Sequence, residues 1–480
     1  MRQINTLVGK TGNLLRDKSG LPMRAQVPRT KWGGVADGRF RPSQYFRLGK
    51  DSQSFWLVDP DGGRFLSKAV NTVRFDQDEI QNSSRIPYAE ACQRKYGGQA
   101  AWRIAAGRRL TSWGFNTLGC WSDEAVAAAA QPLRLALTPN LDLGMSFAWR
   151  KNNDSPAGPK QDFPDVFDPD FDSHIRQAAS ELCADRCNDQ SVIGWFFDNE
   201  LRWGADWRGP DELLTLFLNL ATANPGRVAA IAWLRDRHPD FTQFNSVWRT
   251  PATDWQTLAA LAPVVPPYQL SLPYLRSAPK EETANRADPH RATFMADCET
   301  FAALVAERYF AATSAAIKAV DPHHLLLGCR FAYVPPRAVI EAAGRHTDII
   351  SFNCYETDPS DAIETYAATG KPCLIGEFSF RATDSGLPNT NGAGPLVPDQ
   401  AQRASSFRRY VTAALQHPAL IGYHWFEHAD QPPEGRFDGE NSNFGVVTIK
   451  DDPYLELTRA MTSINGEAEN LHAAATTPVT

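Results

Sequence analysis

The chain contains a repeated pattern in which a short apolar run ends at polar residues and is followed by a stretch with helical spacing. Apolar runs of this length are typical of strands that are buried on both faces of a parallel sheet. The clearest run, Val192–Phe197, ends at Asp198, Asn199 and Glu200. An α/β barrel carries its chemistry at such carboxyl ends of strands. Taken alone, the acidic end is equally compatible with a carboxylate that caps the next helix or pairs with Arg202.

The same pattern recurs and indicates the fold class. Helical stretches at 99–112, 170–187 and 398–416 alternate with the apolar runs, and eight runs match a (β/α)8 TIM barrel with long loops after its strands. A doubly wound sheet has the same alternation, but the chain has no glycine-rich phosphate loop of the dinucleotide or Walker type. We therefore predict the barrel. The eight predicted strands lie within residues 65–73, 113–121, 133–143, 192–199, 325–330, 348–355, 373–378 and 420–427.

The regions before and between these strands have other patterns. Residues 45–48 and 54–58 alternate apolar and polar side chains around Gly49–Asp51, which predicts a β-hairpin. Residues 250–290 have no clear period, so we expect a large loop there. Asp297 is a candidate N-cap for a helix that ends at Val320. The predicted organisation is an arm and hairpin packed on the barrel at 1–60, a catalytic barrel at 61–465 and a C-terminal tail at 466–480.

Composition places the chain among ordinary globular proteins. It is 42% hydrophobic and 22% charged, with a formal net charge of −6. A small negative charge gives no reason to expect nucleic acid or a membrane surface as a partner, and no run reaches the roughly 18 apolar residues of a transmembrane helix. Met1–Leu15 does not resemble a signal peptide. We expect a cytoplasmic protein as written, or a secreted or periplasmic one if a leader has been removed; the sequence leaves the oligomeric state open.

The eight cysteines do not indicate a metal site or a disulfide framework. Only Cys183 and Cys187 are close in sequence, and no second ligand pair accompanies them. Cys329, Cys354 and Cys373 lie within apolar runs, where a free cysteine behaves as a small hydrophobic residue. We therefore expect neither a metal nor an organic cofactor.

A second carboxylate completes a catalytic hypothesis. The seventh predicted strand, Cys373–Phe378, carries Glu377, and Glu200 follows the fourth strand. In a barrel, the two side chains would face each other across its mouth. Hydrolysis of a glycosidic bond with retention uses two carboxyl groups about 5–5.5 Å apart, one as acid/base and one as nucleophile. The pattern therefore favours a glycoside hydrolase that acts on a carbohydrate substrate.

These strand ends also resemble those of a known family. Asn199-Glu200 and Gly376-Glu377 are similar to the catalytic strand ends of clan A glycoside hydrolases. That resemblance implies that Glu200 is the acid/base, that Asn199 binds the sugar 2-hydroxyl and that Glu377 is the nucleophile. The likeness is greatest to the β-agarases and spans about residues 60–460. It rests on the segments Ile193–Leu201, Trp425–Pro432 and Asp438–Val446.

The resemblance extends to two supporting positions. Tyr355 closes the sixth strand, where clan members have a tyrosine that hydrogen-bonds the nucleophile and helps to keep it ionised. Trp425 closes the eighth strand, where they have an aromatic floor beneath the sugar at the cleaved bond. The structural alternative for each is a core aromatic residue at a strand end.

Further candidates for substrate binding come from their positions near strand ends. Trp121, Trp203 and Trp207 are candidates for outer sugar subsites, although loop packing explains a tryptophan equally well. A buried, hydrogen-bonded histidine is the common case at a strand end, so His424 is a weaker candidate. The remaining candidate sugar ligands are Asn353, Glu427, Arg330, Asn116 and Asn71.

The sequence thus predicts a retaining glycoside hydrolase that cleaves a β-linked galactan of the agarose type. A β-galactosidase or β-glucanase of the same clan and a catalytically silent sugar-binding barrel are the alternatives. A metal-dependent barrel hydrolase is a third, but the strand ends carry glutamate and asparagine rather than clustered histidine.

Overall fold

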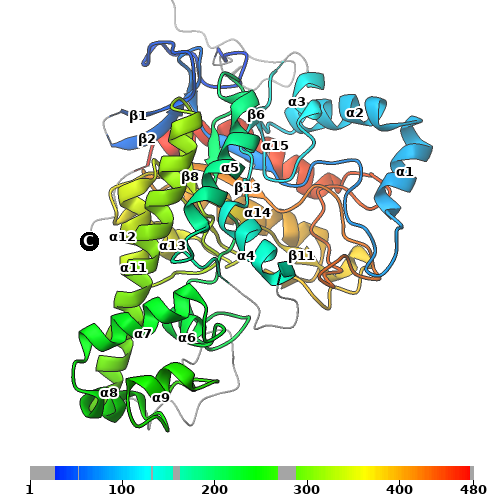
Figure 1. The fold of residues 1–480 in the computed structure, drawn as a ribbon. Coiled ribbons are helices and arrows are strands. Elements are labelled where there is room, and N and C mark those ends of the chain that lie inside the picture. The colour runs from blue at the N-terminus through cyan, green and yellow to red at the C-terminus, as the bar shows by residue number, and fades with distance from the viewer. Residues whose placement is uncertain (1–27, 52, 131–132, 155–162, 269–287, 476–480) are drawn as a thin grey trace, which may run out of the picture.

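The computed structural model describes residues 28–51, 53–130, 133–154, 163–268 and 288–475 (Figure 1). Parts of three predicted segments lie outside these residues: the arm before residue 28, the middle of the loop at 250–290 and the end of the tail.

In the described part of the chain, eight parallel strands form the centre of the fold, each within a predicted run, so the α/β prediction is confirmed. Six of them form one sheet in the order β6-β5-β4-β13-β10-β9, and β7 pairs with β8 in a second sheet. Short apolar strands with buried residues are expected where helices cover a parallel sheet. Their bounds are β4 Ser67–Val70, β5 Thr117–Leu118, β6 Ala136–Leu137, β7 Gly194–Phe196, β8 Leu325–Gly328, β9 Ile350–Asn353, β10 Cys373–Phe378 and β13 Leu420–Trp425.

The two sheets meet at both edges through isolated bridges. Leu137 pairs with Val192 next to β6 and β7, and Phe331 pairs with Phe352 next to β8 and β9, both in parallel orientation. Continuous ladders do not span these two junctions, so the strands do not form one closed sheet. One buried apolar cluster nevertheless takes side chains from strands of both sheets. It includes Ala136, Phe196, Leu327, Leu374 and Ile421.

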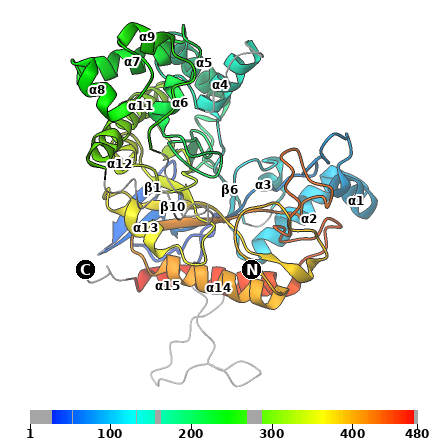
Figure 2. The ribbon, with the colours of Figure 1, turned by 90° about the horizontal axis from the view of Figure 1, so that it is seen from below.

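Helices surround these strands and form a separate cluster at one end of the molecule. Figures 1 and 2 show α6–α9 gathered around the first part of α11, and α14 beside α15 on another side. The predicted helices at 99–112, 170–187 and 398–416 correspond to α2, α5 and α14. The helix bounds are α1 Pro87–Tyr96, α2 Gln99–Ser112, α3 Ala125–Ala129, α4 Leu143–Asp154, α5 Phe171–Cys183, α6 Leu213–Leu218, α7 Pro225–Arg237, α8 Phe241–Trp248, α9 Trp255–Ala260, α11 Pro289–Val320, α12 Arg337–His346, α13 Ser360–Ala367, α14 Gln400–Leu415 and α15 Leu455–Ala473.

The predicted hairpin is confirmed. β1 (Arg47–Asp51) pairs with β2 (Ser54–Val58) in antiparallel register, and β3 (Arg64–Phe65) adds a third strand to β2. A further two-stranded sheet lies in the loop after β10 and consists of β11 (Arg381–Ala382) and β12 (Leu396–Val397).

The predicted start of the long helix is wrong. α11 begins at Pro289 and is capped by Asp288, whose side chain accepts from the His290 amide, whereas Asp297 lies inside the helix. Asp297 is fully buried and accepts a hydrogen bond from Trp248 Nε1 at 3.0 Å. An aspartate before an apolar helical stretch is a cap signal, and here the same residue type is a buried partner of another helix. The predicted end at Val320 is correct.

The predicted boundary at residue 465 falls within α15. On the part of this helix beyond residue 465, Glu469 is buried and contacts Lys68 Nζ on β4 at 2.5 Å and the Arg29 guanidinium at 2.9 Å. Residues 466–473 are therefore a packed part of the fold rather than a tail. Among the helices that the structure describes, none is long and apolar enough to cross a membrane.

Candidate active site

Glu200 and Glu377 line the same cleft, which has a volume of about 1120 Å³. Glu377 lies on β10, one residue before the end of the strand, and Glu200 follows β7 after a short irregular segment. Asn199, Asn353 and Tyr355 also line this cleft. The fold thus brings together polar residues from the ends of three predicted strands that are far apart in the sequence.

Glu377 is held by one cation and one hydroxyl group. Tyr355 Oη donates a hydrogen bond to Glu377 Oε2 at 2.6 Å. The Arg330 guanidinium forms an ion pair with Glu377 Oε1 at 2.9 Å, and both side chains are almost inaccessible to solvent. The two contacts hold both carboxylate oxygens in place at the cleft. This environment suits a carboxylate that acts as a nucleophile.

Glu200 has different surroundings. Its Oε1 atom accepts a hydrogen bond from Asn353 Nδ2 at 2.8 Å, and its main-chain oxygen accepts one from Arg208 at 2.9 Å. Burial, followed by the negative charge of Glu377, raises the pKa of Glu200 to about 7. Two carboxyl groups with different environments in one cleft are the usual basis for assigning an acid and a base or nucleophile.

Arg330 connects the segment that contains Glu200 with β10, which carries Glu377. Its guanidinium donates to Asn199 Oδ1 at 2.9 Å and to the Gly376 carbonyl at 2.7 Å, besides its ion pair with Glu377. It lies over the Trp121 ring at 4.8 Å. Arg330 is fully buried and does not line the cleft. Our prediction that it is a sugar ligand is therefore not supported, because its donors are directed at protein groups.

The backbone takes unusual conformations after four of the eight parallel strands. Thr72, Trp121, Glu200 and Arg330 follow β4, β5, β7 and β8, and their φ angles are 54°, 59°, 53° and 46°. Positive φ is uncommon for residues other than glycine and costs roughly 1–3 kcal/mol where the surroundings impose it. Such strain concentrates at functional sites. Sequence patterns do not reveal it, because none of these residues is a glycine.

Two predicted aromatic residues lie away from the cleft. Trp425 is fully buried, and its Nε1 donates to the Phe444 carbonyl at 2.9 Å. The next residue, Phe426, which follows the end of β13, lines the cleft instead. Trp203 is also buried and stacks on Phe310 with ring centroids 5.5 Å apart. Of the predicted tryptophans, Trp121 and Trp207 line the cleft.

Three predicted polar ligands also have structural partners behind the cleft. His424 is buried 2.9 Å from the Ser67 hydroxyl, and burial lowers its pKa to about 3. Asn116 precedes β5 rather than closing it, and its Oδ1 accepts from the Lys68 amide at 2.9 Å. Glu427 is fully buried and accepts from Thr72 Oγ1 at 2.8 Å. None of the three lines the cleft. The sequence placed each residue near a strand end, but it did not specify the direction of the side chain.

Asp198 has a structural role, but at the start of α4, an earlier helix, rather than as a cap of the next helix. Its two oxygens accept from the amides of Gly144 and Met145, each at 2.8 Å, in the first turn of α4. Tyr309 donates to it at 2.5 Å. Asp198 therefore binds the start of a helix, whereas its neighbours Asn199 and Glu200 line the cleft.

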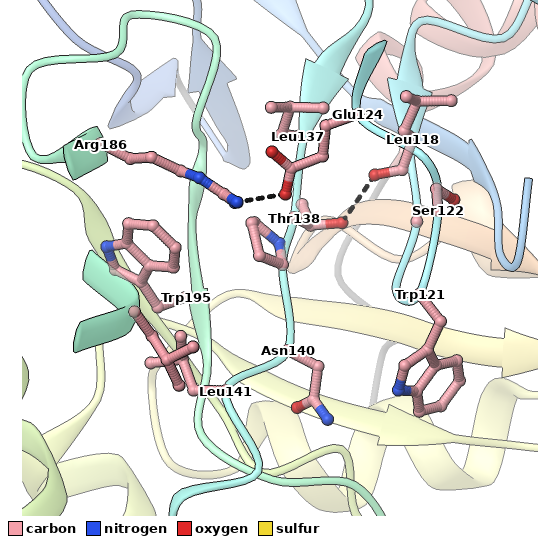
Figure 3. Close-up of a pocket in the computed structure, with 13 residues that line it drawn as sticks. Leu118, Trp121, Ser122, Glu124, Leu137, Thr138, Asn140, Leu141, Arg186 and Trp195 are labelled. Atoms are coloured by element: carbon pink, nitrogen blue, oxygen red, sulfur yellow. Dashed lines mark hydrogen bonds and ion pairs between the residues drawn. The ribbon is translucent and has the colours of Figure 1, made fainter. Parts of the chain in front are cut away.

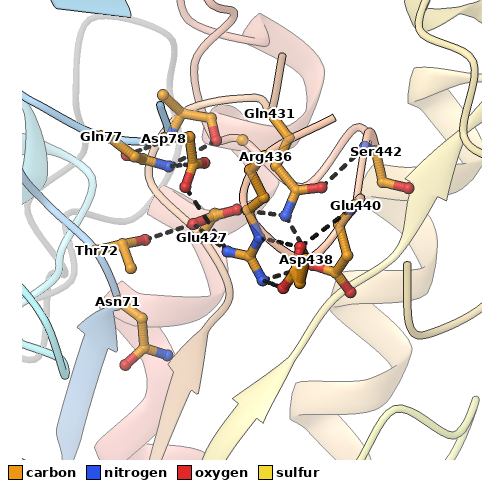
Figure 4. A network of polar contacts seen from close by, with 12 residues as sticks. Asn71, Thr72, Gln77, Asp78, Glu427, Gln431, Arg436, Asp438, Glu440 and Ser442 are labelled. Atoms are coloured by element: carbon orange, nitrogen blue, oxygen red, sulfur yellow. Dashed lines mark hydrogen bonds and ion pairs between the residues drawn. The ribbon is translucent and has the colours of Figure 1, made fainter. Parts of the chain in front are cut away.

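A charged network that the sequence reasoning missed borders the cleft. Figure 4 shows Arg436 surrounded by the carboxyl groups of Asp78, Glu427, Asp438 and Glu440. The distance from Arg436 is 2.7 Å to Glu440 and 3.8 Å to both Glu427 and Asp78. Burial, and then the charge of Asp78, raises the pKa of Glu427 well above its usual value. The segment that contains Asp438 and Glu440 contributed to the family resemblance, but its spacing gave no sign of this cluster.

A smaller cavity of about 180 Å³ lies next to the cleft and shares Trp121 with it. Figure 3 shows Trp195, Asn140 and the ion pair between Arg186 and Glu124 around it. Neither catalytic candidate lines this cavity, so it is not the site of the predicted chemistry. In the described part of the chain, no cluster of histidine, cysteine, aspartate or glutamate residues has the arrangement of a metal site.

The chain is similar to two beta-agarases of Vibrio sp. (strain JT0107). It is 26% identical to beta-agarase B over 93% of this chain and 51% of that protein. It is 28% identical to beta-agarase A over 88% of this chain and 45% of that protein. The chain spans about half the length of these curated relatives. No family model matches it.

Solved structures of agarases have the same fold. The chain superposes on an exo-beta-agarase with a TM-score of 0.74 and 22% identity, covering 93% of this chain and 68% of the other. A second agarase gives a TM-score of 0.70 and 24% identity, with 92% and 68% coverage. The likeness to beta-agarases that the sequence indicated is therefore confirmed: this chain is similar in sequence to two beta-agarases over most of its length and has the fold of solved agarase structures.

Proposed function

We propose that the protein is a retaining glycoside hydrolase that cleaves a β-linked galactan of the agarose type. Glu200 is the acid/base and Glu377 is the nucleophile. The observation that carries this proposal is the pair of glutamates in one cleft, of which one is paired with Arg330 and the other has a pKa raised to about 7. The named activity of the beta-agarase homologues supports the galactan.

The proposed reaction has two displacements. Glu377 attacks the anomeric carbon while Glu200 gives its proton to the glycosidic oxygen, so that the leaving chain departs as an alcohol and a glycosyl-enzyme ester forms. Glu200, now ionised, removes a proton from water, which attacks the same carbon and releases Glu377. Each carboxyl group returns to its starting protonation state.

Asn199 has a defined part in this scheme. Its Oδ1 accepts hydrogen bonds from Arg330 at 2.9 Å and from Asn353 at 3.2 Å. The side-chain amide nitrogen is therefore the group that can donate to a sugar hydroxyl, and Asn199 lines the cleft. This orientation supports the role in binding the 2-hydroxyl that the family resemblance implies.

We also infer that the eight parallel strands constitute a (β/α)8 barrel. Paired strands and isolated bridges connect all eight in the order β4, β5, β6, β7, β8, β9, β10, β13 and back to β4. The buried cluster with side chains from both sheets is what the interior of a barrel requires.

Azide rescue tests both the reaction and the two assignments. The Glu377→Ala and Glu200→Ala variants are assayed with an aryl β-glycoside of an agarose-derived sugar, with and without sodium azide. Loss of one catalytic carboxylate should lower the rate on the order of 10³-fold or more. In Glu377→Ala, azide should attack the anomeric carbon in place of Glu377, from the face opposite the leaving group, and give the α-glycosyl azide. In Glu200→Ala, azide should replace water in the second displacement and give the β-glycosyl azide. Glu364→Ala removes an exposed glutamate outside the cleft and is the matched control.

The result separates the alternatives. Azides of the same configuration from both variants, or full activity of Glu377→Ala, would contradict the assignments. Product analysis of the wild type on agarose, other β-galactans and β-glucans distinguishes an agarase from a β-galactosidase or β-glucanase. A wild type that binds these sugars without turnover would be a sugar-binding protein.

A further inference from the structure

Phe437 is the most exposed of the large hydrophobic side chains in the described residues. It is 80% exposed and lines the cleft, in the loop that follows β13. A single exposed apolar side chain is ordinary on a protein surface. Phe437 differs from such a residue because its exposed ring lines the cleft that also contains Glu200 and Glu377.

The ring is held in place by the charged network. The Arg436 guanidinium lies 5.2 Å from the centroid of Phe437 and 5.4 Å from that of Phe426, and both rings line the cleft. Arg436 is itself fixed by Glu440 at 2.7 Å and Asp438 at 3.0 Å. A cation held by several carboxylates keeps its place against both aromatic faces. Phe437 therefore remains exposed to the cleft although burial would remove its apolar surface from water.

Trp207 is built in the same way in the loop that follows β7. It is 52% exposed and lines the cleft, and the Arg208 guanidinium lies 4.5 Å from the centroid of its ring. Arg208 donates to Asp206 at 2.9 Å and to the main-chain oxygen of Glu200 at 2.9 Å. The tryptophan is thus anchored through its neighbour to the residue that we assign as acid/base.

The two rings belong to opposite sides of the strand arrangement. Between β7 and β13 lie β6, β5 and β4 in one direction and β8, β9 and β10 in the other. Their following loops therefore approach the shared cleft from opposite sides, with Glu200 and Glu377 also lining it. Each side of the cleft therefore has one exposed aromatic ring that packs against a neighbouring arginine.

We propose that Trp207 and Phe437 are binding platforms for two sugar residues of the galactan chain, one on each side of the cleaved bond and beyond the sugars that form it. The C–H groups on one face of a pyranose ring are apolar, and aromatic faces bind such surfaces. This inference rests on the proposed function and adds to it that the cleft holds a chain longer than the two sugars at the cleaved bond.

Substrate length provides the test. Wild type, Phe437→Ala, Trp207→Ala and the conservative Phe437→Tyr are assayed with two agarose oligosaccharides: a disaccharide that spans only the cleaved bond and an oligosaccharide of eight sugars. In each alanine variant, KM for the longer substrate should rise about five- to tenfold, the size expected for one aromatic contact, while kcat changes little. The rise should be smaller for the shorter substrate, and Phe437→Tyr should restore KM because it keeps the ring. Leu455→Ala, which removes an exposed leucine on α15 outside the cleft, is the control.

Each possible result supports or overturns the two proposed platforms. Unchanged KM in both alanine variants overturns the platforms, as does an equal rise for both substrate lengths or a failure of Phe437→Tyr to restore KM. A rise in only one variant overturns the two-sided arrangement. These results leave the proposed function intact, because the wild type still cleaves the galactan. A wild type that cleaves none of the galactan substrates overturns the proposed function and this inference together.

Discussion

Asn353 Nδ2 donates a hydrogen bond to Glu200 Oε1 at 2.8 Å, which connects the end of β9 to the candidate acid/base after β7. A donor of this kind favours the ionised form of a carboxyl group. Burial and the charge of Glu377 act in the opposite direction and dominate, so the pKa of Glu200 is raised to about 7. The balance between these contributions determines the pH range in which Glu200 has a proton to donate.

The first prediction concerns pH. Because Glu200 must be protonated to act as the acid, kcat/KM should fall as pH rises through about 7. The fall should approach about tenfold for each further pH unit. Asn353→Leu removes the donor that favours ionisation, so it should move this alkaline limb to higher pH. Profiles of kcat/KM against pH for wild type and variant measure the effect, and a shift to lower pH would contradict the assignment.

A second prediction concerns Tyr355. Tyr355→Phe keeps the ring but removes the 2.6 Å hydrogen bond to Glu377. A hydrogen bond to a charged group is worth about 1.5–3 kcal/mol, so kcat/KM should fall about 10- to 100-fold. Tyr423→Phe is the matched control, because its buried hydroxyl donates to Asn465 Oδ1 at 2.7 Å and neither residue lines the cleft. That variant should lose stability in thermal unfolding but keep its activity; equal activity losses in both variants would contradict a specific role of Tyr355.

A third prediction concerns stability at acid pH. Asp451 is fully buried and accepts from both terminal nitrogens of Arg109, at 2.8 and 2.6 Å. Although burial acts to raise it, the bonds to Arg109, Tyr88 and Tyr96 lower the pKa of Asp451 to about 2. Since the folded pKa lies below the unfolded value, this stabilisation is complete above about pH 4 and is lost as pH falls toward 2.

The Asp451→Asn variant tests this. At neutral pH its free energy of unfolding should fall by about 3–5 kcal/mol, since Arg109 is left without its counter-charge. The difference from wild type should diminish as pH is lowered in denaturant titrations. Asp452→Asn changes the adjacent, 67% exposed carboxylate and should have little effect. A loss that stays constant down to low pH would show that charge is not the cause.

A fourth prediction concerns α15. Glu469→Gln should leave the buried Lys68 without its counter-charge and lower the free energy of unfolding by about 3–5 kcal/mol. Asn470→Ala, at the neighbouring exposed position, should change it little. Chemical unfolding measures both. Equal stability of the two variants would mean that the end of α15 contributes little to the fold, as the predicted tail implied.

Local sequence was sufficient to place the strands and the two glutamates. Each of the eight strands lies within its predicted run, because a short apolar run between helical stretches has few other ways to be buried. Local sequence was less reliable at helix boundaries. Asp297 has the residue type of a cap but is buried within α11, where it accepts a hydrogen bond from Trp248. The cap of that helix, Asp288, lies just before Pro289.

The sequence by itself determined the parallel α/β class, the likeness to beta-agarases and the pair formed by Glu200 and Glu377. These depend on residue type and spacing along the chain. Only the tertiary structure decided that Phe426 rather than Trp425 faces the cleft, that Arg330 holds Glu377, and that Phe437 is exposed beside them. Those outcomes depend on the direction of each side chain at its strand end and on the partners that the fold brings next to it, which spacing along one strand does not specify.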